Sequence, residues 1–355
     1  MKIFITGICG FVGSTLARHW IESDSSVQLV GMDNLIRNGS QTNRDQLKKL
    51  GVRVFHGDIR VASDFESLPV CDFVIDAAAN PSVLAGVDGR SSSRQVLEHN
   101  LLGTINMLEF CKAVKAGFIL LSTSRVYSIP PLAGLAVVSR DGAFVPDTKA
   151  QLLENFSLRG VSEEFSTRSP VSLYGATKLA SETLALEYGD AFGFPVWINR
   201  CGVLAGAGQF GHAEQGIFSF WLHSWLAKAP LKYIGFGGSG HQVRDLLHPR
   251  DLFDVIKKQI GYSQSPVHRI FNLAGGAGSA MSLANLSKWC ETRWGRHEVS
   301  QHPQGRKYDI PWLVLDSERA RSFWDWKPKL DLETILTEIA VFAEEHRDWL
   351  DLSKV

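Results

Sequence analysis

The stretch ITGICGFVG near the N-terminus constrains the fold more than any other part of the sequence. It begins in an apolar, β-branched run at 2–6 and leads into an amphipathic stretch that continues to about residue 23. Glycines at such a turn let the backbone bend sharply and approach a pyrophosphate, which then lies on the free N–H groups of the helix N-terminus. We therefore predict a dinucleotide site in this turn, formed by Gly7, Gly10, Phe11, Val12 and Gly13.

Short apolar runs alternate with helical patterns through the first two hundred residues. The predicted strands are 2–6, 26–32, 52–58, 72–78, 117–123 and 194–200. Near-continuous apolar strands separated by helices are typical of a parallel sheet that is covered by helices on both faces. The sequence therefore predicts an α/β fold of the Rossmann type, with a doubly wound parallel sheet.

Beyond residue 200, glycine-rich loops, short strands and separate helices replace this alternation. The change predicts a dinucleotide-binding domain over 1–200 and a smaller C-terminal α/β lobe, mainly over 201–355, that binds substrate and is interleaved with the first domain. The segment 128–171 is longer than most connections in compact domains. We therefore expect this insertion to have a function.

An acidic residue lies at the end of the second predicted strand, where a dinucleotide site needs one. Asp33 follows Gly13 by twenty positions. A carboxylate there accepts hydrogen bonds from the adenosine ribose and repels a 2′-phosphate, which favours NAD over NADP. Arg37 weakens this preference, because an arginine can accommodate the phosphate.

Further residues near strand ends are assigned to the same cofactor. Asp58 either meets the adenine edge or is an ordinary turn aspartate. The run AAA provides small residues where the backbone must pass close to the cofactor, although simple packing explains them nearly as well. The other predicted cofactor contacts are Asn34, Ile59, Ala77, Ala78, Ala79 and Asn100.

Tyr174 and Lys178, in SLYGATK, share one face of a predicted helix because they are four residues apart. On spacing alone the pair is an ordinary one on a helix surface. Beside a nicotinamide the pair gains a chemical meaning, since a free tyrosine with a pKa of about 10 is a poor base at neutral pH. A lysine one turn away favours the phenolate and can also hold the nicotinamide ribose. With Thr123 orienting a substrate oxygen at the end of the fifth strand, these three residues are the predicted catalytic group, and Tyr174 and Lys178 also count as cofactor contacts.

These motifs together resemble the extended short-chain dehydrogenase/reductase family, whose members epimerise, dehydrate or decarboxylate nucleotide-sugars. The family pattern combines TGxxGxxG, a Ser or Thr before VY, and YxxxK, and the match covers nearly the whole chain. The resemblance implies a tightly bound NAD that is regenerated in every cycle, a nucleotide-diphosphate sugar as substrate, and a homodimer.

The stretch STSRVYS distinguishes the reactions within that family. Family dehydratases and decarboxylases carry a carboxylate just after the hydroxyl residue, whereas this chain has Ser124 and Arg125. A basic residue before VY resembles the 2-epimerases of CDP-paratose and CDP-tyvelose. The resemblance therefore implies epimerisation at C2 of a CDP-sugar. A 4-epimerase, a ketosugar reductase and a dinucleotide-sensing protein without turnover are the alternatives.

The same resemblance assigns the substrate contacts, which are Pro81, Arg125, Gln215, Arg244 and Arg306. Arg244, in QVRD, matches the family arginine that binds the nucleotide diphosphate, which a guanidinium can do with two parallel hydrogen bonds. The alternative is a surface arginine paired with Asp245. Glu214 stands where this branch of the family more often has Asp.

The charge balance and the cysteine pattern limit which binding partners and metal sites the sequence predicts. Lys plus Arg equal Asp plus Glu, at 37 each, so neither nucleic acid nor an anionic membrane surface is a predicted partner. The five cysteines are scattered and form no Cys/His cluster, which predicts a reduced cytoplasmic protein without a metal site. No uninterrupted apolar run is long enough to span a bilayer.

Overall fold

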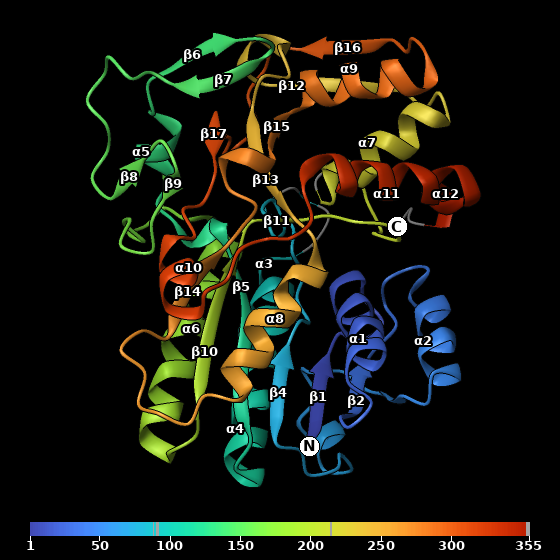
Figure 1. Cartoon of the computed structure of the whole chain (residues 1–355), viewed down its shortest axis with the longest axis vertical. Helices are drawn as coiled ribbons and strands as arrows, with labels where there is room; N and C mark the ends of the chain where they lie inside the picture. The colour runs from blue at the N-terminus through green and yellow to red at the C-terminus, as the bar shows by residue number, and fades with distance from the viewer. Residues whose placement is uncertain (88, 90–91, 214, 353–355) are drawn as a thin grey trace.

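The computed structural model describes residues 1–87, 89, 92–213 and 215–352. A large sheet with helices on both faces forms one part, and a smaller lobe lies beyond the carboxyl ends of its strands (Figure 1). Glu214 lies outside the described residues. In the described part, no helix combines the length and apolar character needed to cross a membrane.

Seven strands form the large sheet, and all of its neighbouring pairs are parallel. Its strands, in spatial order, are β14 (Ile270–Leu273), β10 (Val196–Cys201), β5 (Gly117–Thr123), β4 (Phe73–Asp76), β1 (Lys2–Thr6), β2 (Gln28–Asp33) and β3 (Arg53–His56). The order runs outward in both directions from β1, as in a doubly wound fold. The predicted α/β class and the parallel Rossmann-type sheet are confirmed.

Alternation of side chains along the strands divides the core into two layers. Ile3 and Ile5 of β1 join a buried cluster on the face covered by α1 (Phe11–Ser23) and α8 (Pro249–Ile260). Phe4 points the other way, into a second cluster on the opposite face. The helices α4 (Gly103–Val114) and α6 (Ser172–Phe192) cover that face. Both faces are therefore buried, which explains the near-continuous apolar strands.

The helical segment before β5, at 93–114, is interrupted. It consists of α3 (Ser93–Leu97), a π-helical turn at Glu98–Leu102, and α4. Such π turns are frequent at functional sites, and this one contains Asn100, a predicted cofactor contact. The sequence pattern did not reveal the interruption, because apolar periodicity continues through it.

The smaller lobe has a short sheet centred on β13 (Val243–Leu247) and a separate strand pair. The partners of β13 are β11 (Val203–Leu204), β15 (Ala280–Ser282) and β17 (Trp312–Leu313), and the separate pair is β12 (Leu231–Ile234) with β16 (Val299–His302). The remaining helices are α2 (Ser40–Lys49) in the first domain, α7 (Ile217–Leu226), α9 (Leu283–Trp294), α11 (Leu332–Glu345) and α12 (Trp349–Leu352) in the lobe, and α10 (Glu318–Trp324) near β14.

The insertion 128–171 is folded. It contains α5 (Ile129–Ala133), the hairpin of β6 (Val137–Arg140) with β7 (Ala143–Pro146), and the short pair β8 (Phe156–Ser157) with β9 (Gly160–Val161). Figure 1 places the β6–β7 hairpin beside the smaller lobe, and the Phe144 N–H donates to the His241 carbonyl there at 2.9 Å. The base of the insertion is closed by two backbone hydrogen bonds, from Ser128 to Ser166 at 2.8 Å and from Ile129 to Pro170 at 3.0 Å.

The domain division at residue 200 stays a prediction. Any division has to assign β14 to the large sheet although it lies far beyond residue 200, and to place the insertion next to the lobe.

Candidate active site

The glycine turn between β1 and α1 has the geometry that a pyrophosphate requires. Gly7 has φ +60°, and a Cβ there would lie 3.0 Å from the Ala78 Cα. Gly10 is the N-cap of α1 and provides no side-chain cap. The first N–H groups of this helix are therefore available to a ligand. The turn and the helix N-terminus together fit a dinucleotide.

Replacing Gly13 by Ala tests how closely the turn is packed. A Cβ at Gly13 would lie 2.4 Å from the Gly7 carbonyl oxygen and 2.8 Å from the Ile8 Cα. Both atoms belong to the backbone, so the turn itself must open, at a cost of about 1–3 kcal/mol. We expect Gly13→Ala to retain at most about a tenth of the wild-type NAD content after purification, as measured by chromatography of the released nucleotide.

The control is Gly278→Ala, because a Cβ there meets no atom within 4 Å. Wild-type NAD content in the Gly13→Ala protein would contradict the assignment of this turn to the cofactor.

Asp33 lies at the carboxyl end of β2 and faces the glycine turn. Its carboxylate accepts hydrogen bonds from the backbone N–H groups of Cys9, at 2.9 Å, and Leu35, at 2.8 Å. Burial raises the pKa of Asp33, and these backbone hydrogen bonds oppose the rise. In the sequence, Arg37 weakened the predicted preference for NAD, because an arginine can accommodate a 2′-phosphate. In the structure its guanidinium donates to the Phe210 carbonyl in the smaller lobe. Arg37 is therefore already engaged away from Asp33.

Asp58 has the contacts of a turn aspartate. Its carboxylate accepts from Arg60 at 2.6 and 2.9 Å and from the Asn34 side-chain amide at 3.0 Å. The Arg60 hydrogen bond is the main reason why the pKa of Asp58 is depressed. These contacts hold Asn34 and Asp58 together at the ends of neighbouring strands.

The alanine run after β4 is fixed by its neighbours. The N–H groups of Ala77 and Ala78 donate to the Thr6 hydroxyl at 3.1 and 3.0 Å, and that hydroxyl donates to the Asp76 carboxylate at 2.7 Å. Ala79 follows in the same loop, and the neighbouring Ile59 is buried. This part of the predicted cofactor site is therefore connected directly to the glycine turn.

Asn100, in the π turn, ties the loop after β4 to α6. Its side chain accepts from the Asn80 N–H at 2.7 Å and donates to the Asn80 carbonyl at 3.0 Å and to the Thr177 hydroxyl at 3.3 Å. Thr177 immediately precedes Lys178. Asn100 thus connects the predicted cofactor site to the helix that carries the predicted catalytic pair.

The predicted catalytic residues lie together. Thr123 ends β5, and its hydroxyl accepts from the Arg125 N–H at 3.2 Å and acts to lower the pKa of the Tyr174 phenol. Tyr174 and Lys178 are on the buried face of α6, with exposed fractions of 7% and 2%. A Cβ at Gly175 would lie 2.3 Å from the Arg125 carbonyl oxygen, so α6 and the segment after β5 are in close contact at this point.

We expected Lys178 to lower the pKa of Tyr174, but in the structure this pKa is raised. Burial raises this pKa to about 12, whereas the Thr123 hydrogen bond and the charge of Arg125 act against the rise. Lys178 is not among the groups that shift it. The prediction counted the nearby charge but not the desolvation that burial of the phenol brings.

Arg125 and Arg244 are neighbours in the structure. Burial and the charge of Arg244 lower the pKa of Arg125 to about 9, and the Arg125 Nη1 atom is buried without a hydrogen-bond partner among the described residues. Asp309, which sequence reasoning missed, has its Oδ1 atom 4.0 Å from an Arg244 Nη. Asp245 is not the partner of Arg244, because its carboxylate accepts from the Leu315 N–H at 3.0 Å.

The other predicted substrate contacts are Gln215, Arg306 and Pro81, and of these Arg306 is joined to Asp309, whose backbone N–H donates to the Arg306 carbonyl at 3.3 Å. Gln215 pairs with His212 through two backbone hydrogen bonds, and Arg306 donates to the Ala213 carbonyl at 3.4 Å. Pro81 is half-buried in the loop after β4. In the described part of the chain, none of the three predicted residues forms a hydrogen bond or ion pair with Tyr174.

A buried ion pair joins α6 to the strands β10 and β5 of the large sheet. Glu182, one turn beyond Lys178, accepts from Arg200 of β10 through both carboxylate oxygens, at 2.7 to 3.2 Å, and from Ser122 of β5 at 2.5 Å. The side chains of Glu182 and Arg200 are 2% and 5% exposed. Sequence reasoning missed this pair, although a charged residue inside each of two apolar segments was the available signal.

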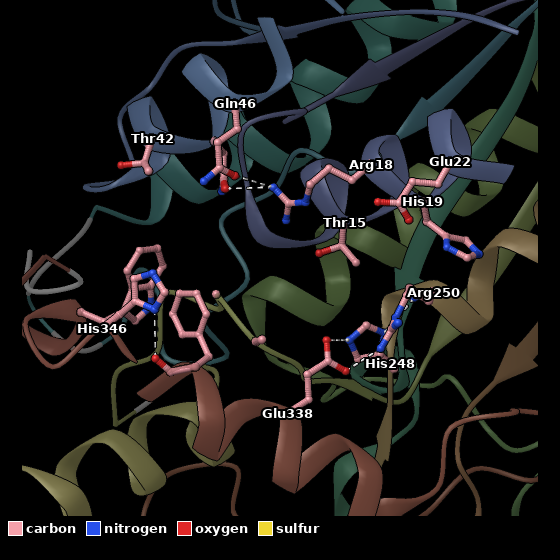
Figure 2. A pocket seen from close by; sticks show the side chains of 15 residues that line it. Thr15, Arg18, His19, Glu22, Thr42, Gln46, His248, Arg250, Glu338 and His346 are labelled. Atoms are coloured by element: carbon pink, nitrogen blue, oxygen red, sulfur yellow. Dashed lines mark hydrogen bonds and ion pairs between the residues drawn. The ribbon is translucent and has the colours of Figure 1, made fainter. Parts of the chain in front are cut away.

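A cavity of about 370 Å³ lies between α1, α2, the start of α8 and α11 (Figure 2). It adjoins the glycine turn, since the Asn43 side chain in its lining donates to the Cys9 carbonyl at 3.0 Å. Arg250 and Glu338 form an ion pair at 2.5 Å across it, and burial lowers the pKa of the adjoining His248 to about 3. No residue predicted for cofactor, substrate or catalysis lines this cavity. Among the described residues, no group of three or more His, Cys, Asp or Glu side chains is arranged to hold a metal ion.

The sequence pattern of the NAD dependent epimerase/dehydratase family matches residues 3–274. CDP-paratose 2-epimerase of Salmonella typhi is 26% identical over 343 residues, covering 93% of this chain and 95% of that protein. UDP-glucuronate 4-epimerase of Thermodesulfobacterium geofontis is 24% identical over 365 residues, covering 99% of this chain and 98% of that protein.

Solved structures show the same fold. UDP-glucuronic acid 4-epimerase from Bacillus cereus, in complex with UDP-glucuronic acid and NAD, superposes with a TM-score of 0.77 at 22% identity, over 97% of this chain and 99% of that chain. UDP-glucose 4-epimerase from Thermus thermophilus, in complex with NAD, gives a TM-score of 0.74 at 22% identity, over 97% and 99%. Because the family pattern spans more than half of the sequence, this chain belongs to the NAD dependent epimerase/dehydratase family, and its cofactor is NAD.

Proposed function

We propose that the protein is a nucleotide-sugar epimerase that inverts C2 of a CDP-sugar of the paratose/tyvelose type. The observation that carries the proposal is the close contact of α6, beside Tyr174, with the segment after β5: a Cβ at Gly175 would lie 2.3 Å from the Arg125 carbonyl oxygen. The positive charge of Arg125 also acts to lower the pKa of Tyr174. Arg125 stands where family dehydratases and decarboxylases have a carboxylate. The similarity to a CDP-paratose 2-epimerase supports the choice of C2 and CDP.

In the proposed reaction the protein moves one proton. Tyr174, as phenolate, takes the proton of a sugar hydroxyl that Thr123 holds in place. When bound, NAD would supply the redox chemistry, as a reversible acceptor of the hydride on the sugar carbon that bears this hydroxyl. Tyr174 then gives the proton back once the planar keto-sugar has presented its other face. Because burial raises the pKa of Tyr174, the phenolate needs positive charge, and Arg125 provides it from the protein.

The other predicted residues receive binding roles in this proposal. The glycine turn and Asp33 hold the two ends of the adenosine diphosphate, and Lys178 holds the nicotinamide ribose. Arg244 binds the nucleotide diphosphate of the sugar, with Asp309 beside it as its counter-charge. A homodimer or higher homo-oligomer, implied by the family resemblance, and a cytoplasmic location, expected from the scattered cysteines, belong to the same proposal.

Inversion at C4 of a UDP-sugar is the second candidate. It is favoured by the UDP-glucuronate 4-epimerase that aligns with nearly the whole chain. The two reactions place different sugar carbons next to Tyr174, so the residues around Arg125 and Gln215 decide between them rather than the catalytic group.

Incubating the purified protein with CDP- and UDP-sugars separates the candidates. In D₂O, NMR of the products at C2 and C4 reports which centre inverts, and the proposal predicts inversion at C2 with CDP-sugars only. Inversion at C4 of a UDP-sugar would replace the first candidate by the second. Turnover of no nucleotide-sugar would refute both.

A further inference from the structure

The side chain of Lys178 is buried and lacks an acidic partner in direct contact among the described residues. In the described part of the chain, its ammonium forms no hydrogen bond and no ion pair. Burial lowers the pKa of Lys178, and three neighbours oppose this effect: Asp76 on β4, Glu182 on α6 and Cys201 on β10. The charge state of Lys178 therefore depends on which of these three carries an uncompensated negative charge.

Two of the three are already accounted for. The Glu182 carboxylate is bound by the Arg200 guanidinium through both oxygens, at 2.7 to 3.2 Å. Burial raises the pKa of Cys201 to about 12, so this thiol is neutral at physiological pH. Neither group provides a free negative charge for Lys178.

Asp76 differs, because its hydrogen-bond partners are both hydroxyl groups. Its two oxygens accept from Thr6 at 2.7 Å and from Thr104 at 3.1 Å, and the residue is 1% exposed. No cation lies within ion-pair distance among the described residues. The other ionisable group that it affects is Cys111 on α4, a thiol whose pKa is raised well above its usual value by burial.

A chain of buried hydrogen bonds connects Asp76 to the helix turn that carries Lys178. The Thr104 hydroxyl lies 3.1 Å from an Asp76 carboxylate oxygen and 2.9 Å from the Asn100 carbonyl oxygen, and its single proton is shared between these two acceptors. The same carbonyl accepts from Ser181 at 3.1 Å, and the Asn100 side chain donates to Thr177 at 3.3 Å. Ser181 and Thr177 flank Lys178 on α6, so this network holds the helix turn that carries Lys178 in place relative to the Asp76 carboxylate.

We propose that Asp76 is a positioning residue whose buried carboxylate is the counter-charge of Lys178 and keeps it in its ammonium form at the active site. The inference deepens the proposed function, because it concerns the same catalytic lysine. Asp76 also links the glycine turn to the alanine run through Thr6. A suitable experiment must therefore separate the effect of its charge from that of its hydrogen bonds.

Asp76→Asn removes the charge and keeps the shape and one of the two acceptor oxygens; the other becomes an NH2 group, from which the Thr104 hydroxyl oxygen can accept. Lys178→Met removes the ammonium, and the double variant removes both charges. We expect Asp76→Asn to lower the Tm of the purified protein by about 3 °C or more, and we expect at least half of this loss to disappear when Lys178→Met is also present. Thr104→Val is the matched control, since it removes a hydrogen bond to Asp76 but no charge. Its loss of Tm should be the same with or without Lys178→Met.

The pH dependence gives a second readout. Because the pKa of Lys178 is lower in the folded chain than in the unfolded chain, the unfolded chain binds more protons between the two values and stability rises with pH there. Loss of Asp76 extends this range towards neutral pH. The Tm difference between wild type and Asp76→Asn should therefore be largest where Lys178 is charged in the wild-type protein, and should shrink as the pH rises towards the ordinary pKa of lysine, about 10.4.

Each outcome decides the proposal. If Asp76→Asn fails to fold alone, recovery of the folded protein in the double variant supports it. No recovery, or equal losses at all pH values and in both Lys178 backgrounds, overturns it. These measurements need no turnover. Failure of the charge pairing is therefore distinguishable from failure of the proposed epimerase reaction, which the sugar assays test.

Discussion

Tyr174→Phe is expected to reduce kcat for the proposed epimerisation by about 10³-fold, with NAD content unchanged. The substitution removes the phenol oxygen on which Thr123 and Arg125 act and leaves the buried ring in place. The described groups that act on the Tyr174 phenol are poor bases at neutral pH: the Thr123 hydroxyl, the Arg125 guanidinium and the Cys201 thiol, whose pKa burial raises to about 12. Single-turnover assays with the preferred sugar and chromatography of the released cofactor measure both quantities.

Tyr188→Phe provides the control on the same helix. Tyr188 lies on α6 but points outward, where its hydroxyl donates to Glu109 at 2.7 Å. This variant should keep its kcat within about a factor of two, since surface changes of this kind have small effects. A Tyr174→Phe protein with full activity would show that proton transfer occurs elsewhere.

Glu182→Gln is expected to destabilise the protein by about 3–5 kcal/mol, because it leaves the Arg200 charge buried without its partner. Arg200 has 5% of its side chain exposed, so water cannot replace the carboxylate. Its Nη1 contacts, the Tyr127 hydroxyl and the Glu163 carbonyl, both at 3.3 Å, are neutral and do not balance the charge. Urea denaturation followed by circular dichroism gives the free energy of unfolding.

The matched control is Glu187→Gln, on the exposed face of the same helix. We expect its free energy of unfolding to lie within about 0.5 kcal/mol of the wild-type value. If both variants were equally stable, the Glu182–Arg200 pair would not contribute to stability, and the support that it gives to α6 would have to come from apolar packing alone.

Local sequence patterns were sufficient to predict candidate site residues that lie close together in the sequence. The glycine turn, Asp33 at the end of β2, and Tyr174 four residues before Lys178 each depend on one strand or helix and the residues beside it. The parallel sheet followed from the alternation of apolar runs with helices, and the structure confirms it.

Features that depend on neighbours distant in the sequence were not predictable in this way. Asp76 meets Thr104 and Arg200 meets Glu182 because of the order β10-β5-β4 in the sheet, which one sequence does not reveal. The raised pKa of Tyr174 has the same origin, since desolvation depends on the whole fold around the phenol. Charged residues inside apolar strands were visible, but their partners were not.

The closed base of the insertion has a consequence for how the protein can change. The two backbone hydrogen bonds, from Ser128 to Ser166 and from Ile129 to Pro170, hold the ends of the segment together between Thr123 and Tyr174. The chain between these two hydrogen bonds can change in length or sequence while its two ends keep their positions. Variation in the region that borders the smaller lobe is thereby uncoupled from the spacing of the hydroxyl and the phenol, and a new specificity can arise without a new reaction centre.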